Sequence, residues 1–301
     1  MTARPVDGAG VVCRCPSATL GGEPGVEVGR AAGGRGWLLL PRRRRRARRA
    51  RGHPSEAGTA TASEGSVGPA PVALVAPHVG YVYSGPVAAS AYDWLRDRPV
   101  RRVAVLGPAH FVPLTGVAVP AAAAFATPIG EVPVEVHTCA VLAERQECVT
   151  VDDRPHRPEH SIEVQLPFLQ RVLAHGWTCV PLVVGATPPE QVADVLDTLC
   201  VDGDLLPVVS TDLSHYLDQP TAQRRDRHTA QAVVDRDAAA IGPHDACGVF
   251  ALRGLLHWAR RHELDVRLLH LGTSAEAGGD PRRVVGYGAF ALLPSTGLSS
   301  R

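Results

Sequence analysis

Apolar runs and segments with helical spacing alternate along most of the chain. Apolar runs typical of strands occupy residues 72–76, 102–107, 117–120, 178–184, 206–211, 266–272 and 284–293. Segments with the apolar spacing of helices occupy residues 86–96, 134–144, 161–174, 188–200, 221–240 and 246–262. Residues 125–132 predict a hairpin or a turn. Because strands alternate with helices, the fold class predicted is α/β, with a largely parallel central sheet flanked by helices.

This regular pattern predicts one domain over residues 69–295, followed by a short tail at 296–301. Residues 1–68 differ, because they are rich in glycine, alanine and arginine and have no sustained period. We interpret this Arg/Gly-rich N-terminal segment as disordered and solvated, since its composition cannot build a packed core. Two alternatives stay open: a basic arm for nucleic acid or anionic lipid, and a misassigned or frameshifted start.

Composition excludes several classes of function. The chain has a net charge of +1, but the arginine excess is confined to residues 1–68, so the folded domain is mildly acidic and a nucleic-acid role for it is disfavoured. There is no lysine, which excludes a Schiff-base lysine and a Walker-type phosphate lysine. The cysteine count of 7 is odd, with no Cys-x-x-Cys pair, which favours a reducing, cytoplasmic location over a disulfide framework. No apolar run approaches the ~18 residues of a membrane span.

Three histidines follow predicted strands directly. His78 lies in a glycine-rich loop after the run at 72–76, His110 follows the run at 102–107, and His215 follows the run at 206–211. Open α/β sheets build their sites at the carboxyl ends of parallel strands. If these strands are parallel neighbours, the three imidazoles lie on one rim of the sheet.

Cys247 lies at the start of the predicted helix 246–262, where the helix N-terminus favours the thiolate. Two histidines and a thiolate suit a transition metal such as iron, copper or zinc, and they leave a coordination position open. Asp212 precedes His215 by three residues, a spacing that lets a carboxylate orient an imidazole. His215 is therefore a candidate acid/base or a further ligand.

The run from Asp152 to Pro167 is dense in ligating groups. Glu159 and Glu163 share one face if the run is helical. Their presence there is also explained by the ordinary preference of acidic residues for the first turn of a helix. The functional interpretation places His160 or Glu163 beside the site, and both interpretations stay open. Tyr81, in the loop after His78, is another candidate supporting residue.

Several of these segments resemble the motifs of one known family. The matching segments are residues 77–85, 106–110, 159–168, 211–216, 272–274 and 284–288. They resemble the Memo family, also called AmmeMemoRadiSam system protein B in bacteria and archaea, and the resemblance covers roughly residues 70–293. The family usually opens with an Arg-x-Pro…Ala-Gly-x-Phe-Tyr-Pro segment, which residues 1–68 lack, and this difference underlies the hypothesis of a misassigned start.

The resemblance implies a fold similar to that of class III extradiol dioxygenases, which are non-haem iron enzymes. It implies His78, His110 and Cys247 as metal ligands, with His215 as acid/base and Asp212 beside it. Cys247 stands where those dioxygenases have a glutamate, and a thiolate is softer and more easily oxidised. The implied cofactor is a transition metal ion, with iron first and copper or zinc as alternatives. The implied function is that of an oxidoreductase, or of a redox or metal-handling partner of radical-SAM and AMMECR1-like proteins.

Two other classes of function stay open. The same crevice could serve a non-catalytic module that binds a peptide or a partner protein, for which metal is unnecessary. Alternatively, Cys247 could be the nucleophile of a metal-free hydrolase or transferase, with His215 or His244 as base. Metal content separates these hypotheses, whereas the small-molecule or peptide ligand itself is not indicated by the sequence.

Overall fold

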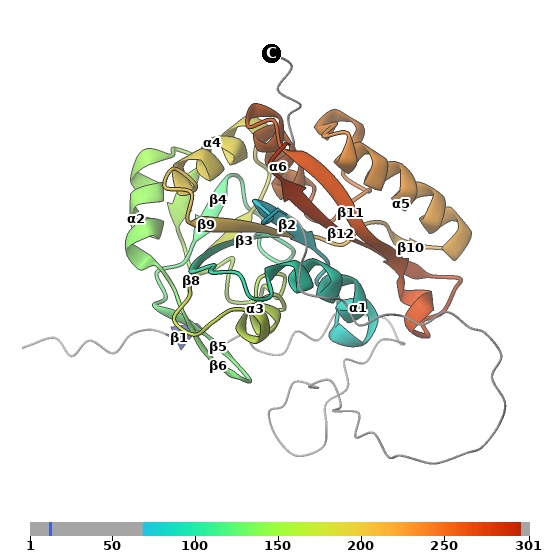
Figure 1. Cartoon of the computed structure of the whole chain (residues 1–301), viewed down its shortest axis with the longest axis horizontal. Helices are drawn as coiled ribbons and strands as arrows, with labels where there is room; N and C mark the ends of the chain where they lie inside the picture. The colour runs from blue at the N-terminus through green and yellow to red at the C-terminus, as the bar shows by residue number, and fades with distance from the viewer. Residues whose placement is uncertain (1–11, 14–68, 296–301) are drawn as a thin grey trace, which may run out of the picture.

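A mixed nine-stranded sheet forms the centre of the molecule (Figure 1). This computed structural model describes residues 12–13 and 69–295. The N-terminal segment predicted at 1–68, apart from Val12–Cys13, and the tail predicted at 296–301 lie outside the described residues. Among the described residues, no helix is both long enough and apolar enough to cross a membrane.

Four adjacent parallel strands make the middle of the sheet, in the order β2 (Ala73–Ala76), β9 (Leu205–Ser210), β3 (Arg102–Pro108) and β8 (Thr178–Val184). Nearly every residue in them is buried, as expected for strands covered on both faces. The α/β class is confirmed, and the strands before His78 and His110 both flank β9, so their carboxyl ends lie at the same edge.

The outer strands make the sheet mixed. On one side, β12 (Val284–Leu293) pairs antiparallel with β2, with β11 (Asp265–Thr273) and with β10 (His215–Leu217). On the other side, β4 (Val117–Val119) runs antiparallel to β8 and parallel to β7 (Val149–Val151). The hairpin predicted at 125–132 is confirmed as β5 (Ala124–Thr127) and β6 (Gly130–Pro133), with β1 (Val12–Cys13) parallel to β5.

Helices cover both faces of the sheet. On one face lie α1 (Tyr81–Tyr92) and α3 (Leu166–Val172), whose Tyr92 and Phe168 rings stack. On the opposite face, α4 (Pro189–Leu199) packs against α6 (Val249–Arg261), and α5 (Gln219–Val234) lies along β11 and β12 (Figure 1). The remaining α-helix, α2 (Val136–Arg145), packs beside β7. Short 3-10 helices occur at Asp93–Leu95, Ala238–Ala240 and Ser274–Ala277.

Three helix boundaries differ from the prediction near the candidate site. The helix predicted from 86 begins at Tyr81, so Pro86 lies inside α1 rather than at its first position. The helix predicted from 161 begins only at Leu166, because the five residues before it form turns. The helix predicted from 246 begins at Val249, which leaves Cys247 just outside it.

Candidate metal centre

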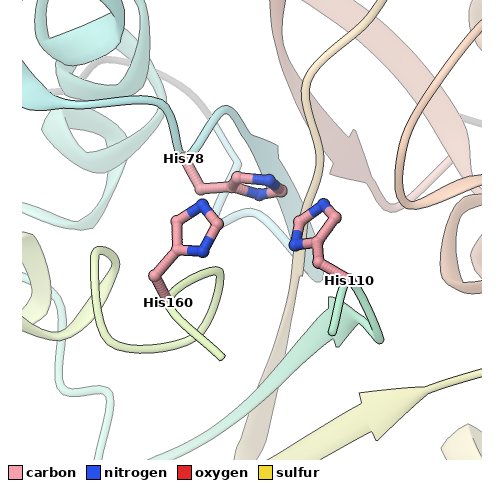
Figure 2. Close-up of side chains that lie close together, drawn as sticks. All are labelled: His78, His110 and His160. Carbon is pink, nitrogen blue, oxygen red and sulfur yellow. The ribbon is translucent and has the colours of Figure 1, made fainter. Parts of the chain in front are cut away.

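Two overlapping groups of metal-ligating side chains lie at the carboxyl ends of β2, β3 and β9. One comprises His78, His110 and His160, and the other comprises His78, Asp212 and Cys247. Within each group, one ligand atom of every residue lies within 4.8 Å of those of the others. His78 belongs to both groups and is therefore the centre of the site. Figure 2 shows the three imidazoles facing one another across a common space.

The hydrogen bonds of Ser210 fix the tautomer of His78. The Ser210 hydroxyl donates its proton to the Ser161 carbonyl at 2.6 Å and accepts from Gln165 Nε2 at 2.7 Å. A serine hydroxyl has a single proton, so at 2.9 Å it can only accept from His78 Nδ1. His78 therefore carries its proton on Nδ1, and the lone pair of Nε2 points toward the other ligands.

Burial keeps the His78 imidazole neutral. The side chain is 1% exposed, and desolvation lowers the pKa of His78 to about 4 against the opposing charge of Asp212. The neutral imidazole is the form that binds a metal. His78 is thus prepared as a ligand by both its tautomer and its charge.

His110 is oriented by the carboxylate of Glu159. Glu159 accepts from the His110 backbone N–H at 2.8 Å and pairs with His110 Nδ1 at 2.9 Å. Burial by itself would raise the pKa of Glu159, but the hydrogen bonds from His110 and from the backbone of Ser161 lower it to about 2. The ionised carboxylate favours a proton on His110 Nδ1 and leaves Nε2 available, the arrangement typical of metal-bound histidines.

His160 enters the site because its loop lies against β3. A Cβ atom at Gly107 would lie 2.3 Å from Ser161 Oγ, so only glycine permits this approach. The His160 ring stacks on His110 with centroids 5.2 Å apart and meets His78 edge-on at 5.5 Å. Burial lowers the pKa of His160, so this imidazole is also neutral near pH 7.

Cys247 reaches His78 through a second close approach. The Gly248 backbone packs against Thr211 so closely that a Cβ atom at Gly248 would lie 2.8 Å from Thr211 Cβ. The neighbouring Cys247 sulfur lies 3.4 Å from His78 Nε2. Sγ also accepts the backbone N–H of Asp212 at 3.2 Å. Burial, followed by the Asp212 charge, raises the pKa of Cys247, which opposes the predicted activation of the thiol by a helix N-terminus.

The donor atoms fit a transition metal ion. At bond lengths of ~2.0 Å to nitrogen and ~2.3 Å to sulfur, two ligands at a tetrahedral angle are about 3.5 Å apart. The distance of 3.4 Å between His78 Nε2 and Cys247 Sγ matches this spacing. Neutral imidazoles and a sulfur favour iron, copper or zinc over magnesium or calcium.

Comparison with known proteins identifies the family. Residues 60–291 match the family described as Memo-like protein. The chain belongs to the Memo family. A "MEMO1 family protein" of Thermotoga neapolitana is 34% identical over 232 residues, which is 72% of this chain and 81% of that protein. "MEMO1 family protein TV1383" of Thermoplasma volcanium is 28% identical over 229 residues, 73% of this chain and 84% of that protein.

One solved structure has a weaker likeness to this Memo-family chain. It is described as an uncharacterized protein, JW3007, from Escherichia coli K12. The two are 15% identical, the match covers 72% of this chain and 98% of that one, and the TM-score is 0.46.

Asp212 and His215 lie in different surroundings in this Memo-family fold. The Asp212 carboxylate accepts from the backbone N–H of His78 at 3.0 Å and lies 3.4 Å from His78 Nε2. His215 lies instead in β10, pairs with Val285 of β12 and stacks edge-on against Tyr216. Among the described residues, His215 is in neither ligand group, so its role as acid/base stays a prediction.

Of the other two predicted supporting residues, Tyr81 is the first residue of α1 and Glu163 lies in the turn before α3. The Tyr81 hydroxyl donates to the Val164 carbonyl at 3.0 Å. Burial, followed by the nearby Glu163 carboxylate, raises the pKa of Tyr81. Tyr81 therefore holds the turn after His160 against α1, and neither Tyr81 nor Glu163 belongs to the two ligand groups.

Sequence reasoning missed two residues that position the imidazoles in this family member. Glu159 was interpreted only as an acid of a helix start, and Ser210 only as the end of a strand. The available signal for Glu159 was its place directly before His160 in a run dense in ligating groups. No local signal marked Ser210, because its partners His78, Ser161 and Gln165 lie 132, 49 and 45 residues away.

Proposed function

We propose that this chain binds a transition metal ion, with iron as the first candidate and copper or zinc as alternatives, at His78, His110 and Cys247. The proposal is carried by the unprotonated Nε2 of His78, which faces the partly buried Cys247 sulfur at a distance suited to a shared ion. Family membership and the overlapping ligand groups support the same conclusion.

The residues around the site have separate tasks in this proposal. Ser210 keeps the proton on His78 Nδ1, and Glu159 does the same for His110. The Asp212 backbone N–H stabilises negative charge on the Cys247 sulfur as the thiol ionises. A bound ion would supply Lewis acidity and, in the case of iron or copper, electron exchange with a small substrate.

We further propose that the function is redox chemistry, as an oxidoreductase or as a redox or metal-handling partner of radical-SAM and AMMECR1-like proteins. The soft, oxidisable sulfur among the donors supports redox or metal handling rather than simple structural binding. His215 is the proposed acid/base, because residues 211–216 resemble the family segment that implies this role.

Metal analysis tests the site. The full chain is purified without oxygen, offered iron, copper or zinc, and analysed by mass spectrometry beside a His78→Ala/His110→Ala variant. The matched control is His137→Ala/His175→Ala, which removes two exposed histidines outside the site. We expect one ion per chain in the wild type and the control, and loss of the ion in the site variant. No ion in any of the three proteins would refute the proposal and favour a peptide- or protein-binding module.

A further inference from the structure

His160 has a buried nitrogen that no protein group satisfies. Its Nδ1 has no hydrogen-bond partner among the described residues. The nearest acceptor, Glu159 Oε1, is 3.5 Å away. That oxygen already accepts from His110 Nδ1 and from the backbone N–H groups of His160 and Ser161, each at 2.9 Å. Leaving a buried polar atom without a partner is costly, so the His160 ring is not fully satisfied by protein groups and is a candidate for a ligand.

The orphaned nitrogen belongs to a ring that already faces the site. The His160 ring centroid is 5.2 Å from that of His110 and 5.5 Å from that of His78. One ligand nitrogen of each ring lies within 4.8 Å of the others, and the rings surround a common space (Figure 2). Two ligands of one ion lie about 3–4 Å apart. The spacing within this group of three imidazoles is close to that range.

We propose that His160 is a further metal ligand, so that three imidazoles hold the ion together with the Cys247 sulfur. This inference rests on the proposed function, which assigns two imidazoles and the sulfur, and adds the third nitrogen. A set of three imidazoles and one sulfur suits a divalent first-row transition metal and disfavours calcium and magnesium, which prefer oxygen ligands.

Glu159 links the two imidazoles that flank His78. One carboxylate orients His110 through its ring and holds His160 through its backbone. Its negative charge lies beside both rings and offsets part of the positive charge of an ion. The dipeptide of Glu159 and His160 thus supplies a ligand together with the group that orients its neighbouring ligand.

Zinc binding tests the number of nitrogen ligands, because zinc is redox-inert and does not oxidise the thiol. The affinity of the full chain for Zn²⁺ is measured by chelator competition, and the ligands are counted by X-ray absorption. The test variant is His160→Phe, which keeps a ring against His110 but removes both nitrogens. His175→Phe, at an exposed histidine outside the site, is the control.

We expect His160→Phe to lose one imidazole from the zinc shell and to keep the zinc–sulfur contact. Its affinity for Zn²⁺ should be at least tenfold weaker, because losing a group that only orients a ligand already weakens metal binding ~10–100-fold. His160→Gln serves the same comparison if the phenylalanine variant does not fold. An unchanged imidazole count and an affinity within twofold of the wild type would overturn the assignment of His160. The proposed function fails separately, if the wild type binds none of iron, copper and zinc or if His78→Ala leaves Zn²⁺ binding unchanged.

Discussion

The Ser210 hydroxyl holds three buried groups in place, and Ser210→Ala removes all three contacts with one atom. The partners are His78 Nδ1 at 2.9 Å, Gln165 Nε2 at 2.7 Å and the Ser161 carbonyl at 2.6 Å. Ser210 is fully buried, so water has no open path to replace the missing oxygen. The variant therefore leaves three polar groups with one partner fewer.

The expected loss of stability follows from that count. A buried donor or acceptor without its partner costs about 1–3 kcal/mol, so the lower figure gives about 3 kcal/mol for three groups. For a domain of this size, each kcal/mol lowers the melting temperature by about 2–4 °C, which predicts a decrease of about 6–12 °C. Because His78 also loses the group that fixes its tautomer, metal affinity should fall ~10–100-fold.

Urea unfolding of the metal-free protein measures the first effect, and chelator competition measures the second. The control is Ser90→Ala, which removes a half-buried hydroxyl that donates only to the Val87 carbonyl within α1. We expect this control to stay within about 0.5 kcal/mol of the wild type. If Ser210→Ala changes the free energy of unfolding no more than Ser90→Ala does, the reasoning about the three lost contacts is refuted. An unchanged metal affinity would refute the reasoning about His78 orientation.

Two further predictions concern stability away from the site. In α6, a Cβ atom at Gly254 would lie 2.3 Å from Val192 of α4, so Gly254→Ala should lower the free energy of unfolding in urea by about 1–3 kcal/mol. The control is Gly85→Ala in α1, where the nearest atom to a Cβ is 3.8 Å away, and this variant should be neutral or stabilising. Equal effects of the two substitutions would contradict this packing. The hydrogen bond from Arg102 lowers the pKa of Glu135 to about 2, below its ordinary 4.5, so its stabilisation is fully present above pH 4.5 and is lost as the pH falls toward 2. Glu135→Gln should therefore lower the free energy of unfolding at pH 7. It should also reduce the loss of that free energy between pH 4.5 and 2, measured by unfolding at a series of pH values. An unchanged dependence on pH in this range would contradict the pairing of Glu135 with Arg102.

Parts of the fold could be predicted because they depend on local pattern. The runs at 178–184 and 284–293 coincide with β8 and β12, since continuous apolar runs bounded by polar residues are typical of buried strands. The hairpin of β5 and β6 was recognisable from its glycine-containing turn. By contrast, β7 and β10 are each three residues long, too short to show a period.

Within the site, the sequence indicated which residue types were present but not which of them meet. His78 and His110 were recognised from their places after strands, and the structure brings their ring centroids to 5.2 Å. His215 follows β9 in the same way, yet the chain turns into β10 and carries it to the antiparallel side of the sheet. A strand-end position limits where a side chain begins, whereas the following turn decides where it lies.

The sequence alone determined the alternating order of strands and helices, the parallel centre of the sheet and the candidate ligands His78, His110 and Cys247. Only the tertiary structure decided that His160 lies beside His78 and His110, that Ser210 and Glu159 set the tautomers, and that burial raises the pKa of the thiol. The physical reason is the separation along the chain of the residues that interact. Periodicity and strand ends depend on neighbours along the chain, whereas hydrogen-bond partners and desolvation within the site depend on contacts between residues up to 169 positions apart.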